Sequence, residues 1–431
     1  MAITNVSGPT AANYAGETNK SAMAMVTTLF FMWGFLTALN DILIPHLRNI
    51  FSLNYTESML VQFTFFSGYA VFGIPSGKVV EWIGYQRSMV AGLFMMGVGA
   101  VLFIPAASAP SFPFFLGAQV VLVAGIVLLQ TAANPYVTIL GPAESGASRL
   151  NLTQAFNSLG TTLAPYFGSL LILTATAESA AQISKMHGSA LRFYQVREAA
   201  SVKMPYLGIA IALVLLGVII AIYKFPRIST TKDFRPMKAT DHAHSVWRYR
   251  HMVLGAIAIF LYVGAEVSIG SFLTNYFSQP DTGGMTIQTA AKLVSFYWGG
   301  AMVGRFIGSA VLQRVSTAKL VGLCSVVAFG LLVTSIFSFG MLAVWTILLV
   351  GLFNSILFPS IFTLGIAELG PLTGEGSGIL VSAIVGGGLL PLAEGALADR
   401  IGIHHAFIIP ALCYVFIAYY GFSGSKVRLP A

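Results

Sequence analysis

The residues most able to do chemistry are carboxylic acids inside long apolar stretches. Asp41 follows Asn40 in "TALNDILIP", and Glu266 lies in the middle of the apolar stretch 250–276. A carboxylate inside a bilayer is costly unless it faces water, a cation or a proton. Both acids are therefore candidates for ligand or ion binding, and Glu394 is a weaker one. The alternatives are an interfacial carboxylate for Asp41 and a protonated interhelical hydrogen bond for Glu266.

Four amides form a second group of candidates. Gln130 and Asn134 are four residues apart, so they share one face of a helix. Gln154 and Asn157 are three residues apart and also share a face. Amides offer both donors and acceptors, which suits a neutral polyol. An anionic substrate would instead need a cation such as Arg305, which reads better as a latch residue. The alternative role of the amides is hydrogen bonding between helices.

Aromatic side chains could complete a sugar site, because they stack on the apolar face of a pyranose ring. Trp33 lies eight residues before Asp41, on a similar helix face. Trp298 and Phe358 are further candidates, and Asn354, four residues before Phe358, is a candidate polar contact from the second half. Aromatic residues make up 12% of the chain, so packing explains any single one equally well.

The elements that position these residues follow from an apolar composition. Of the 431 residues, 56% are hydrophobic and 9% are charged, whereas soluble proteins carry about a quarter charged residues. The chain lacks the polar surface of a soluble globule, so most of it must lie in lipid. Cys324 and Cys413 lie in apolar runs without metal-ligand spacing, and we expect them to be small core residues.

Apolar stretches of about 20 residues, the length that spans a bilayer, occur twelve times. Each is expected to be a transmembrane helix, six before a basic connector and six after it. Their ranges are 23–45, 58–80, 88–107, 112–138, 150–174, 204–224, 250–276, 289–312, 318–338, 340–363, 377–399 and 404–423.

The spans define the expected domains. A cytoplasmic tail (1–22) precedes an N-terminal six-helix bundle (23–224), a cytoplasmic connector (225–249), a C-terminal six-helix bundle (250–424) and a second tail (425–431). This orientation, with both termini in the cytoplasm, places most of the 23 Lys and Arg residues inside, as the positive-inside rule requires.

The two halves share an ordered set of residues, which indicates a duplication. One set recurs 231 residues later and another 224 residues later: Gly68, Ala70, Gly73 and Gly77, and Pro135, Leu140, Gly141 and Glu144. Two similar halves around a midplane cavity are typical of transporters that alternate access. The loop "GKVVEWIGYQRS" (77–88) predicts a cytoplasmic latch: Gly77 allows close helix approach, and Glu81 and Arg87 can pair across helix ends.

Twelve spans, the repeat and this loop resemble the major facilitator superfamily. Three blocks are similar to its fucose/proton symporter family: "FFMWGFLTALNDILIP" (30–45), "QTAANPYVTILGP" (130–142) and "RLNLTQAFNSLG" (149–160). Two more are similar to the glucose/galactose transporter branch: "VGAEVSIGSFLTNYF" (263–277) and "FNSILFPSIFTLG" (353–365). The resemblance implies an all-α membrane protein whose twelve transmembrane helices form two pseudo-symmetric six-helix bundles.

The resemblance also implies roles for single residues. It places the coupling aspartate on Asp41, sugar-contacting amides on Gln154 and Asn157, and an aromatic contact on Trp33. The fucose branch carries a glutamate where this chain has Gln130, which cannot titrate. Ion sensing then rests on Asp41, assisted by Glu266 and by neutral oxygens such as that of Asn40. This favours sodium near Asp41 slightly over a proton, although Asp41 alone could also carry a proton.

The sequence therefore predicts a cation-coupled symporter that imports a neutral hexose, such as glucose, galactose or fucose, across a bacterial inner membrane. The alternatives are an uncoupled sugar facilitator or sensor and a drug/proton antiporter. The exporter signature of the fifth span is incomplete at Ala164 and Ser169. No nucleotide loop, metal cluster or nucleophile–base pair suggests an enzyme. We expect a monomer with no cofactor and no nucleic-acid partner.

Overall fold

The computed structural model describes residues 18–51, 55–108, 111–171, 188–200, 203–225 and 245–428, and within these ranges the chain is helical without strands. Long apolar sequences explain this, because a helix satisfies its own backbone hydrogen bonds in lipid. The helices of the N-terminal half are α1 (Lys20–Phe51), α2 (Tyr55–Ile83), α3 (Tyr85–Ser108), α4 (Phe112–Ile139), α5 (Gly146–Leu171), α7 (Ser189–Ala200) and α8 (Lys203–Ile222).

The C-terminal half has more interruptions. Its helices are α10 (Arg250–Phe277), α11 (Ile287–Val311), α12 (Thr317–Phe337), α13 (Gly340–Asn354), α14 (Leu357–Gly365), α15 (Thr373–Ser382), α16 (Gly386–Ile401), α17 (Ile403–Ala406) and α18 (Ile408–Tyr419). Short 3-10 turns lie at Ala143–Ser145, Val246–Arg248, Gly370–Leu372 and Ala383–Val385, and a π-helical turn at Tyr420–Gly424.

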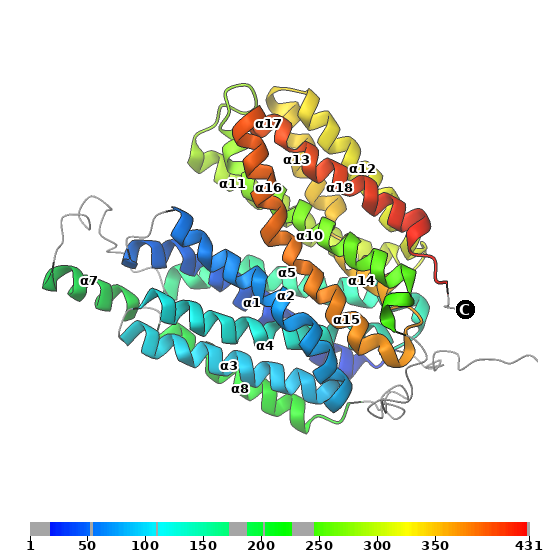
Figure 1. Ribbon diagram of the computed structural model, residues 1–431, viewed down its shortest axis with the longest axis horizontal. Coiled ribbons are helices and arrows are strands. Elements are labelled where there is room, and N and C mark those ends of the chain that lie inside the picture. Colours follow the sequence, from blue (N-terminus) through cyan, green and yellow to red (C-terminus); the bar gives the residue numbers. More distant parts are fainter. Residues whose placement is uncertain are drawn as a thin grey trace, which may run out of the picture.

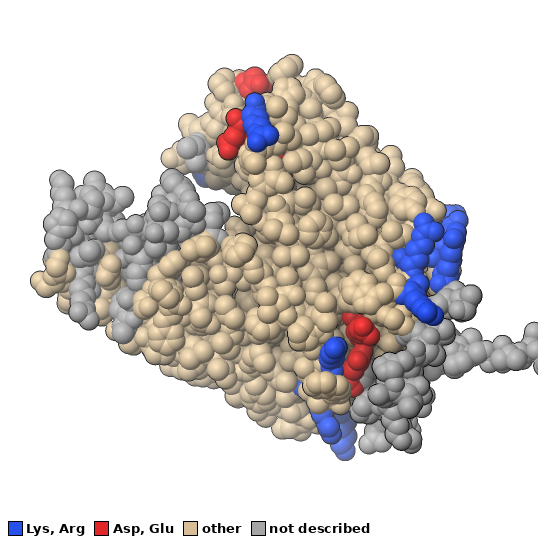
Figure 2. Space-filling model, viewed as in Figure 1, with Lys and Arg blue, Asp and Glu red and all other residues tan. Residues whose placement is uncertain are grey.

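Within the described residues, each of the twelve expected spans coincides with one helix or with successive helical segments. Within the described residues, eight helical segments are long and apolar enough to cross a membrane. In the face shown in Figure 2, acidic and basic side chains gather near the ends of the molecule and leave a broad uncharged middle. The helix α7 was not expected, because its polar sequence lies in the 176–200 loop.

The helices form two bodies, which Figure 1 shows as a lower one built from α1 to α8 and an upper one built from α10 to α18. In the first, α1 packs on α5, α3 packs on α4 and α8, and α2 packs on α4. In the second, α10 packs on α16 and α18, and α12 packs on α13 and α18. These are the two six-helix bundles that the repeat predicts.

The bodies touch where α5 meets α11 and where α2 meets α15. A Cβ on Gly77 would lie 2.7 Å from the Gly374 carbonyl oxygen, and one on Gly378 would lie 2.6 Å from the Gly73 carbonyl oxygen. Glycines therefore let the two helix backbones approach closely. We call the contact of α2 with α15 at these four glycines the closed end of the molecule.

The latch expected at the closed end is only partly as predicted. The Glu81 carboxylate accepts a hydrogen bond of 2.9 Å from the Glu375 backbone N–H, in the first turn of α15. An acid at a helix N-terminus is stabilised by the helix dipole. The expected partner, Arg87, is exposed and forms no ion pair within the described chain. Glu81 and Arg87 are therefore not paired in this structure, because α15 offers Glu81 a partner that the sequence of the loop does not contain.

Candidate functional site

Buried amides of α4 lack hydrogen-bond partners. Gln130 is 2% exposed and Asn134 is fully buried. The Gln130 side-chain oxygen and both polar atoms of the Asn134 amide form no hydrogen bond. An unpaired buried polar atom costs about 1–3 kcal/mol, so this face of α4 offers several atoms to a ligand.

The proline of α4 adds a further acceptor beside these amides. Pro135 has no N–H, so the Thr131 carbonyl loses its donor within the helix. The Thr131 hydroxyl does not replace that donor, because it is bonded to the Val127 carbonyl at 2.8 Å. The Thr131 carbonyl therefore receives no helical hydrogen bond from residue 135.

On α5 the two expected amides differ. Gln154 is 3% exposed, and its Nε2 donates to no acceptor. The Asn157 Nδ2 instead donates a 2.9 Å hydrogen bond to the Phe30 carbonyl of α1. A Cβ on Gly34 would lie 2.1 Å from the Asn157 carbonyl oxygen, so α1 and α5 pack closely at this level. Gln154 is thus available to a ligand, whereas Asn157 fastens two helices together.

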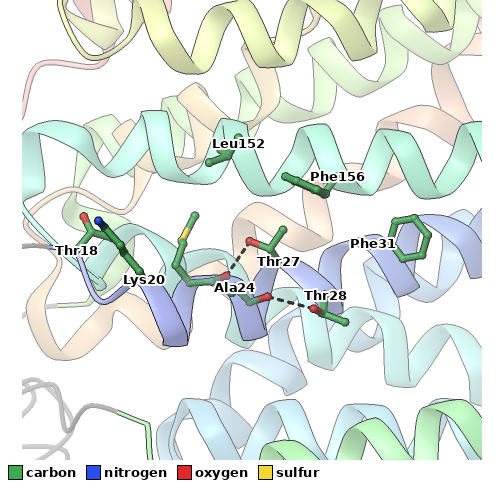
Figure 3. A pocket seen from close by; sticks show the side chains of 9 residues that line it. Thr18, Lys20, Ala24, Thr27, Thr28, Phe31, Leu152 and Phe156 are labelled. Atoms are coloured by element: carbon green, nitrogen blue, oxygen red, sulfur yellow. Dashed lines mark hydrogen bonds between the residues drawn. The ribbon is translucent and has the colours of Figure 1, made fainter.

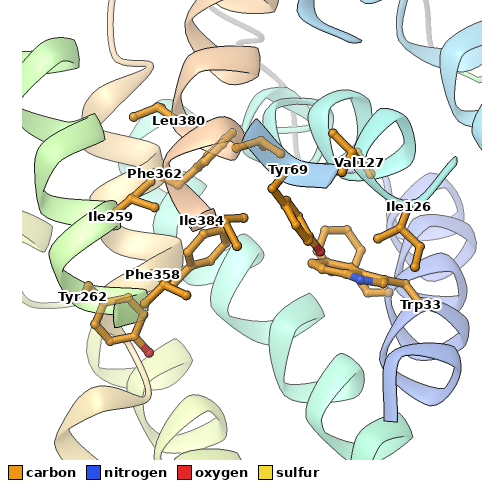
Figure 4. Close-up of a cluster of buried hydrophobic side chains, with 14 of the residues drawn as sticks. Trp33, Tyr69, Ile126, Val127, Ile259, Tyr262, Phe358, Phe362, Leu380 and Ile384 are labelled. Carbon is orange, nitrogen blue, oxygen red and sulfur yellow. The ribbon is translucent and has the colours of Figure 1, made fainter. Parts of the chain in front are cut away.

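Aromatic side chains of the two halves face each other across the centre of the molecule (Figure 4). Trp33 is 9% exposed and lies beside Tyr69 of α2, and its indole Nε1 has no hydrogen-bond partner in the described structure. Phe358 of α14 is 8% exposed, and its ring centroid lies 6.1 Å from that of Phe362. Trp33 and Phe358 therefore lie among inward-facing side chains. Trp298, in contrast, is 44% exposed.

In the C-terminal half a closed hydrogen-bond network surrounds Asn354. Its Nδ2 donates to the Tyr297 hydroxyl at 2.9 Å, and its Oδ1 accepts from the Tyr414 hydroxyl at 2.5 Å. The Tyr262 hydroxyl donates to the Glu266 carboxylate at 2.7 Å and also contacts the Asn354 carbonyl at 3.1 Å. The network joins α10, α11, α13 and α18 around a half-buried carboxylate.

Arg305 of α11 connects this network to the N-terminal half. Its Nε donates to the Ser355 carbonyl at 3.3 Å, and its terminal nitrogen donates to the Ser158 hydroxyl of α5. It also interacts electrostatically with Glu266. Ser158 in turn donates to the Gln154 carbonyl at 3.1 Å. Arg305 therefore links the carboxylate of one half to the amide-bearing helix of the other, beyond the latch role expected from the sequence.

Two expected coupling residues cannot be placed in this geometry. Asn40 and Asp41 belong to α1 by backbone, but their side chains lie outside the described residues. Among the residues whose side chains are described, no group of three His, Cys, Asp or Glu residues could hold a metal ion.

Sequence reasoning missed three tyrosines: Tyr262, Tyr297 and Tyr414. Each is fully buried, so from sequence each reads as packing. One signal was present, because Tyr262 lies four residues before Glu266 and therefore on the same helix face. Tyr297 and Tyr414 come from other helices, and no local spacing connects them to Asn354.

A cavity of about 500 Å³ lies away from this site, between α1 and α5. Figure 3 shows its lining, which includes Lys20, Phe31 and Phe156. The Thr27 and Thr28 hydroxyls that also line it are bonded to carbonyls of their own helix. The lining of this cavity offers few free polar atoms and does not include Gln130, Asn134 or Gln154, so the cavity is not the candidate sugar site.

Comparisons with known proteins agree with this fold. The sequence model described as Major Facilitator Superfamily matches residues 23–390. The chain is 51% identical to the glucose/galactose transporter of Brucella abortus, with 94% of both chains covered. It is 35% identical to the L-fucose-proton symporter of Escherichia coli, with 91% of both covered.

A crystal structure of the transporter FucP in the outward conformation matches with a TM-score of 0.86 and 34% identity, covering 93% of this chain and 97% of that one. The helical order, the paired bundles and these matches lead to one conclusion. The chain belongs to the Major Facilitator Superfamily of multi-pass membrane transporters.

Proposed function

We propose that this protein is a symporter that couples the entry of a neutral hexose, glucose or galactose, to the entry of protons. The observation that carries the proposal is the set of buried amide atoms without partners on Gln130, Asn134 and Gln154. A hexose presents hydroxyl groups that both donate and accept, and so do amides. The names of relatives, glucose/galactose transporter and L-fucose-proton symporter, support the same substrate class.

Charge distribution favours a neutral substrate. Arg305, the cation that reaches the centre, is already bonded to Ser158 and Ser355 and interacts with Glu266. An anionic sugar would have to compete with Glu266 for this cation. A neutral sugar needs no such exchange, and its ring can lie against Trp33 or Phe358.

The proposed coupling ion is the proton. The preference for sodium that the sequence suggested finds no support, because the relative whose name states an ion is a proton symporter. Asp41 is the proposed carrier of this proton, and Glu266 assists it. A carboxylate can bind and release a proton as its exposure changes during transport, which an amide at Gln130 cannot do.

We further propose that the closed end faces the cytoplasm, together with both termini and the 225–249 connector. With α2 and α15 in contact at that end, the sugar site would open to the opposite side of a bacterial inner membrane. The matching structure in the outward conformation supports this assignment. The division at residues 23–224 and 250–424, and a monomeric state, belong to the same proposal.

The test is uptake of labelled glucose, galactose and fucose into proteoliposomes, with proton and sodium gradients imposed separately. We expect accumulation of glucose or galactose above equilibrium under an inward proton gradient, and none under a sodium gradient at equal pH. Equilibration without accumulation under either gradient would instead identify an uncoupled facilitator. Failure to move any of the three sugars would contradict the proposed substrate class.

A further inference from the structure

α10 and α16 pack along a seam with a regular register. A Cβ on Gly386 would lie 2.0 Å from the Phe260 carbonyl oxygen, and a Cβ on Gly264 would lie 2.1 Å from the Leu390 side chain. Both contacts join residues that are 126 positions apart. Because this separation is constant, α10 and α16 run parallel. Each further helical turn then brings together another pair of residues that are 126 positions apart.

The next turn of this seam pairs two polar residues, Ser268 of α10 and Glu394 of α16. Glu394 is 1% exposed, and both oxygens of its carboxyl group lack a hydrogen-bond partner. Ser268 is fully buried, and its hydroxyl also lacks a partner in the described structure. Ser268 and Glu394 repeat the 126-residue separation of the seam, which places their side chains next to each other.

The surroundings of Glu394 require that it carry a proton in this state. A buried carboxylate without a cation or donors is strongly destabilising, and no ion pair involving Glu394 is formed in the part of the chain that the structure describes. The titratable groups that interact with it are Tyr297 of α11 and Cys413 of α18. Where α2 meets α16, it places Phe66 beside Gly387 and Gly388.

The same helix carries the candidate site. Tyr262 and Glu266, which belong to the network around Asn354, lie on α10 just before Ser268. A displacement of α10 by a ligand at Glu266 would therefore alter the seam at Ser268. Opening the seam admits water to Glu394, whereas closing it again favours the neutral acid.

We propose that Glu394 is a second proton-binding residue of the transport cycle, placed in the seam between α10 and α16. Its carboxylic O–H releases one proton to water when α10 moves and becomes a carboxylate, to which the Ser268 hydroxyl then donates. On return of α10 the carboxylate takes up one proton. This inference rests on the proposed function and adds a coupling residue to it.

The experiment compares Glu394→Gln with wild type in proteoliposomes, with labelled galactose supplied in the external buffer. Glutamine resembles the protonated acid in shape, so we expect sugar counterflow, which needs no net proton movement, to stay within about twofold of wild type. Accumulation under an inward proton gradient should fall at least about tenfold. The matched control is Glu144→Gln, which neutralises an exposed acid and should leave accumulation unchanged.

Infrared difference spectroscopy gives a second measurement that does not depend on the folding of a variant. Adding galactose to the wild-type protein should change the C=O stretching band of a protonated carboxyl group, and Glu394→Gln should lack that change. Accumulation by Glu394→Gln at the wild-type level, or no change of this band in wild type, would overturn the proposal. If wild type itself moves no sugar, the proposed function fails instead.

Discussion

Equivalent amides in the two halves have opposite surroundings. Gln130 lies five residues before Pro135, and Asn354 lies five residues before Pro359, at the 224-residue spacing of the repeat. The Asn354 amide is bonded at both of its polar atoms, to Tyr297 and Tyr414, whereas the Gln130 oxygen has no partner. The difference supports the proposal that a ligand supplies the missing partner at Gln130.

The backbone near each proline shows the same contrast. Each proline deprives the carbonyl four residues earlier of its helical donor. In the C-terminal half that carbonyl belongs to Ser355, and the Arg305 Nε supplies the replacement donor at 3.3 Å. In the N-terminal half the equivalent carbonyl belongs to Thr131. The C-terminal half thus holds a preassembled hydrogen-bond network, and we propose that the N-terminal half supplies most of the ligand contacts.

The largest expected effects come from exchanging one amide at a time for alanine. Gln130→Ala should weaken galactose binding by about 1–3 kcal/mol, the cost of leaving buried sugar hydroxyls unpaired. It should leave thermal stability near that of wild type, because the lost oxygen has no partner in the protein. Titration calorimetry and thermal unfolding of the detergent-purified protein measure the two quantities.

Asn354→Ala is the matched variant in the other half. It leaves the Tyr414 hydroxyl without a partner and removes the amide donor to the Tyr297 hydroxyl, which keeps its bond to the Glu266 carbonyl, so thermal stability should fall by about 1–3 kcal/mol. If Gln130→Ala is the less stable of the two variants and Asn354→Ala the weaker binder, the contrast between the halves has been assigned the wrong way round.

A smaller effect is expected within α5. Gln154→Ala should reduce galactose affinity by about 1–2 kcal/mol without a change in stability, since its Nε2 has no partner. Asn157→Ala should reduce both quantities, because its Nδ2 also ties α5 to the Phe30 carbonyl. Equal stability losses in the two variants would contradict the distinction between a ligand amide and an interhelical amide.

The link between the halves is tested by Arg305→Lys. A lysine keeps the charge but lacks the planar fork that reaches Ser158 and Ser355 together. We expect transport to slow several-fold while galactose affinity changes less than about twofold, measured by counterflow and calorimetry. A tenfold loss of affinity with an unchanged rate would make Arg305 a sugar ligand.

The smallest effect concerns pH at the closed end. Burial, with repulsion from Glu375, raises the pKa of Glu81 from 4.5 to about 7. Because the closed arrangement holds this proton more tightly than an open one, its extra stability is complete below pH 4.5 and is lost as pH rises through 7. Spin labels on α2 and α15, with both native cysteines replaced, should report more closed molecules at pH 6 than at pH 8. Glu81→Gln should abolish that difference.

Much of the fold could be predicted because membrane helices depend on length and apolarity alone. The exceptions depend on partners distant in sequence. Glu81 finds the backbone of Glu375, which local reading of the loop cannot supply. The sequence suggested Asn354 as a polar contact of the substrate. That both polar atoms of its amide are bonded, to Tyr297 and Tyr414, depends on how three helices pack.

The candidate site was predicted at the level of residue type. Spacing showed that Gln130 and Asn134 share a face, yet it could not show that their polar atoms lack partners. Likewise, Asn157 matched a sugar-contacting position by resemblance, while the structure gives it a bond to α1. Whether a buried polar atom finds a hydrogen-bond partner depends on how the helices pack, and a sequence pattern does not show this.

The most direct test of the central claim is a structure of the protein with galactose bound. The account predicts sugar hydroxyls within hydrogen-bond distance of the amides of Gln130, Asn134 and Gln154, with the Asn354 amide still bonded to Tyr297 and Tyr414. A sugar bound elsewhere, with these amides paired to one another or to the backbone, would contradict it.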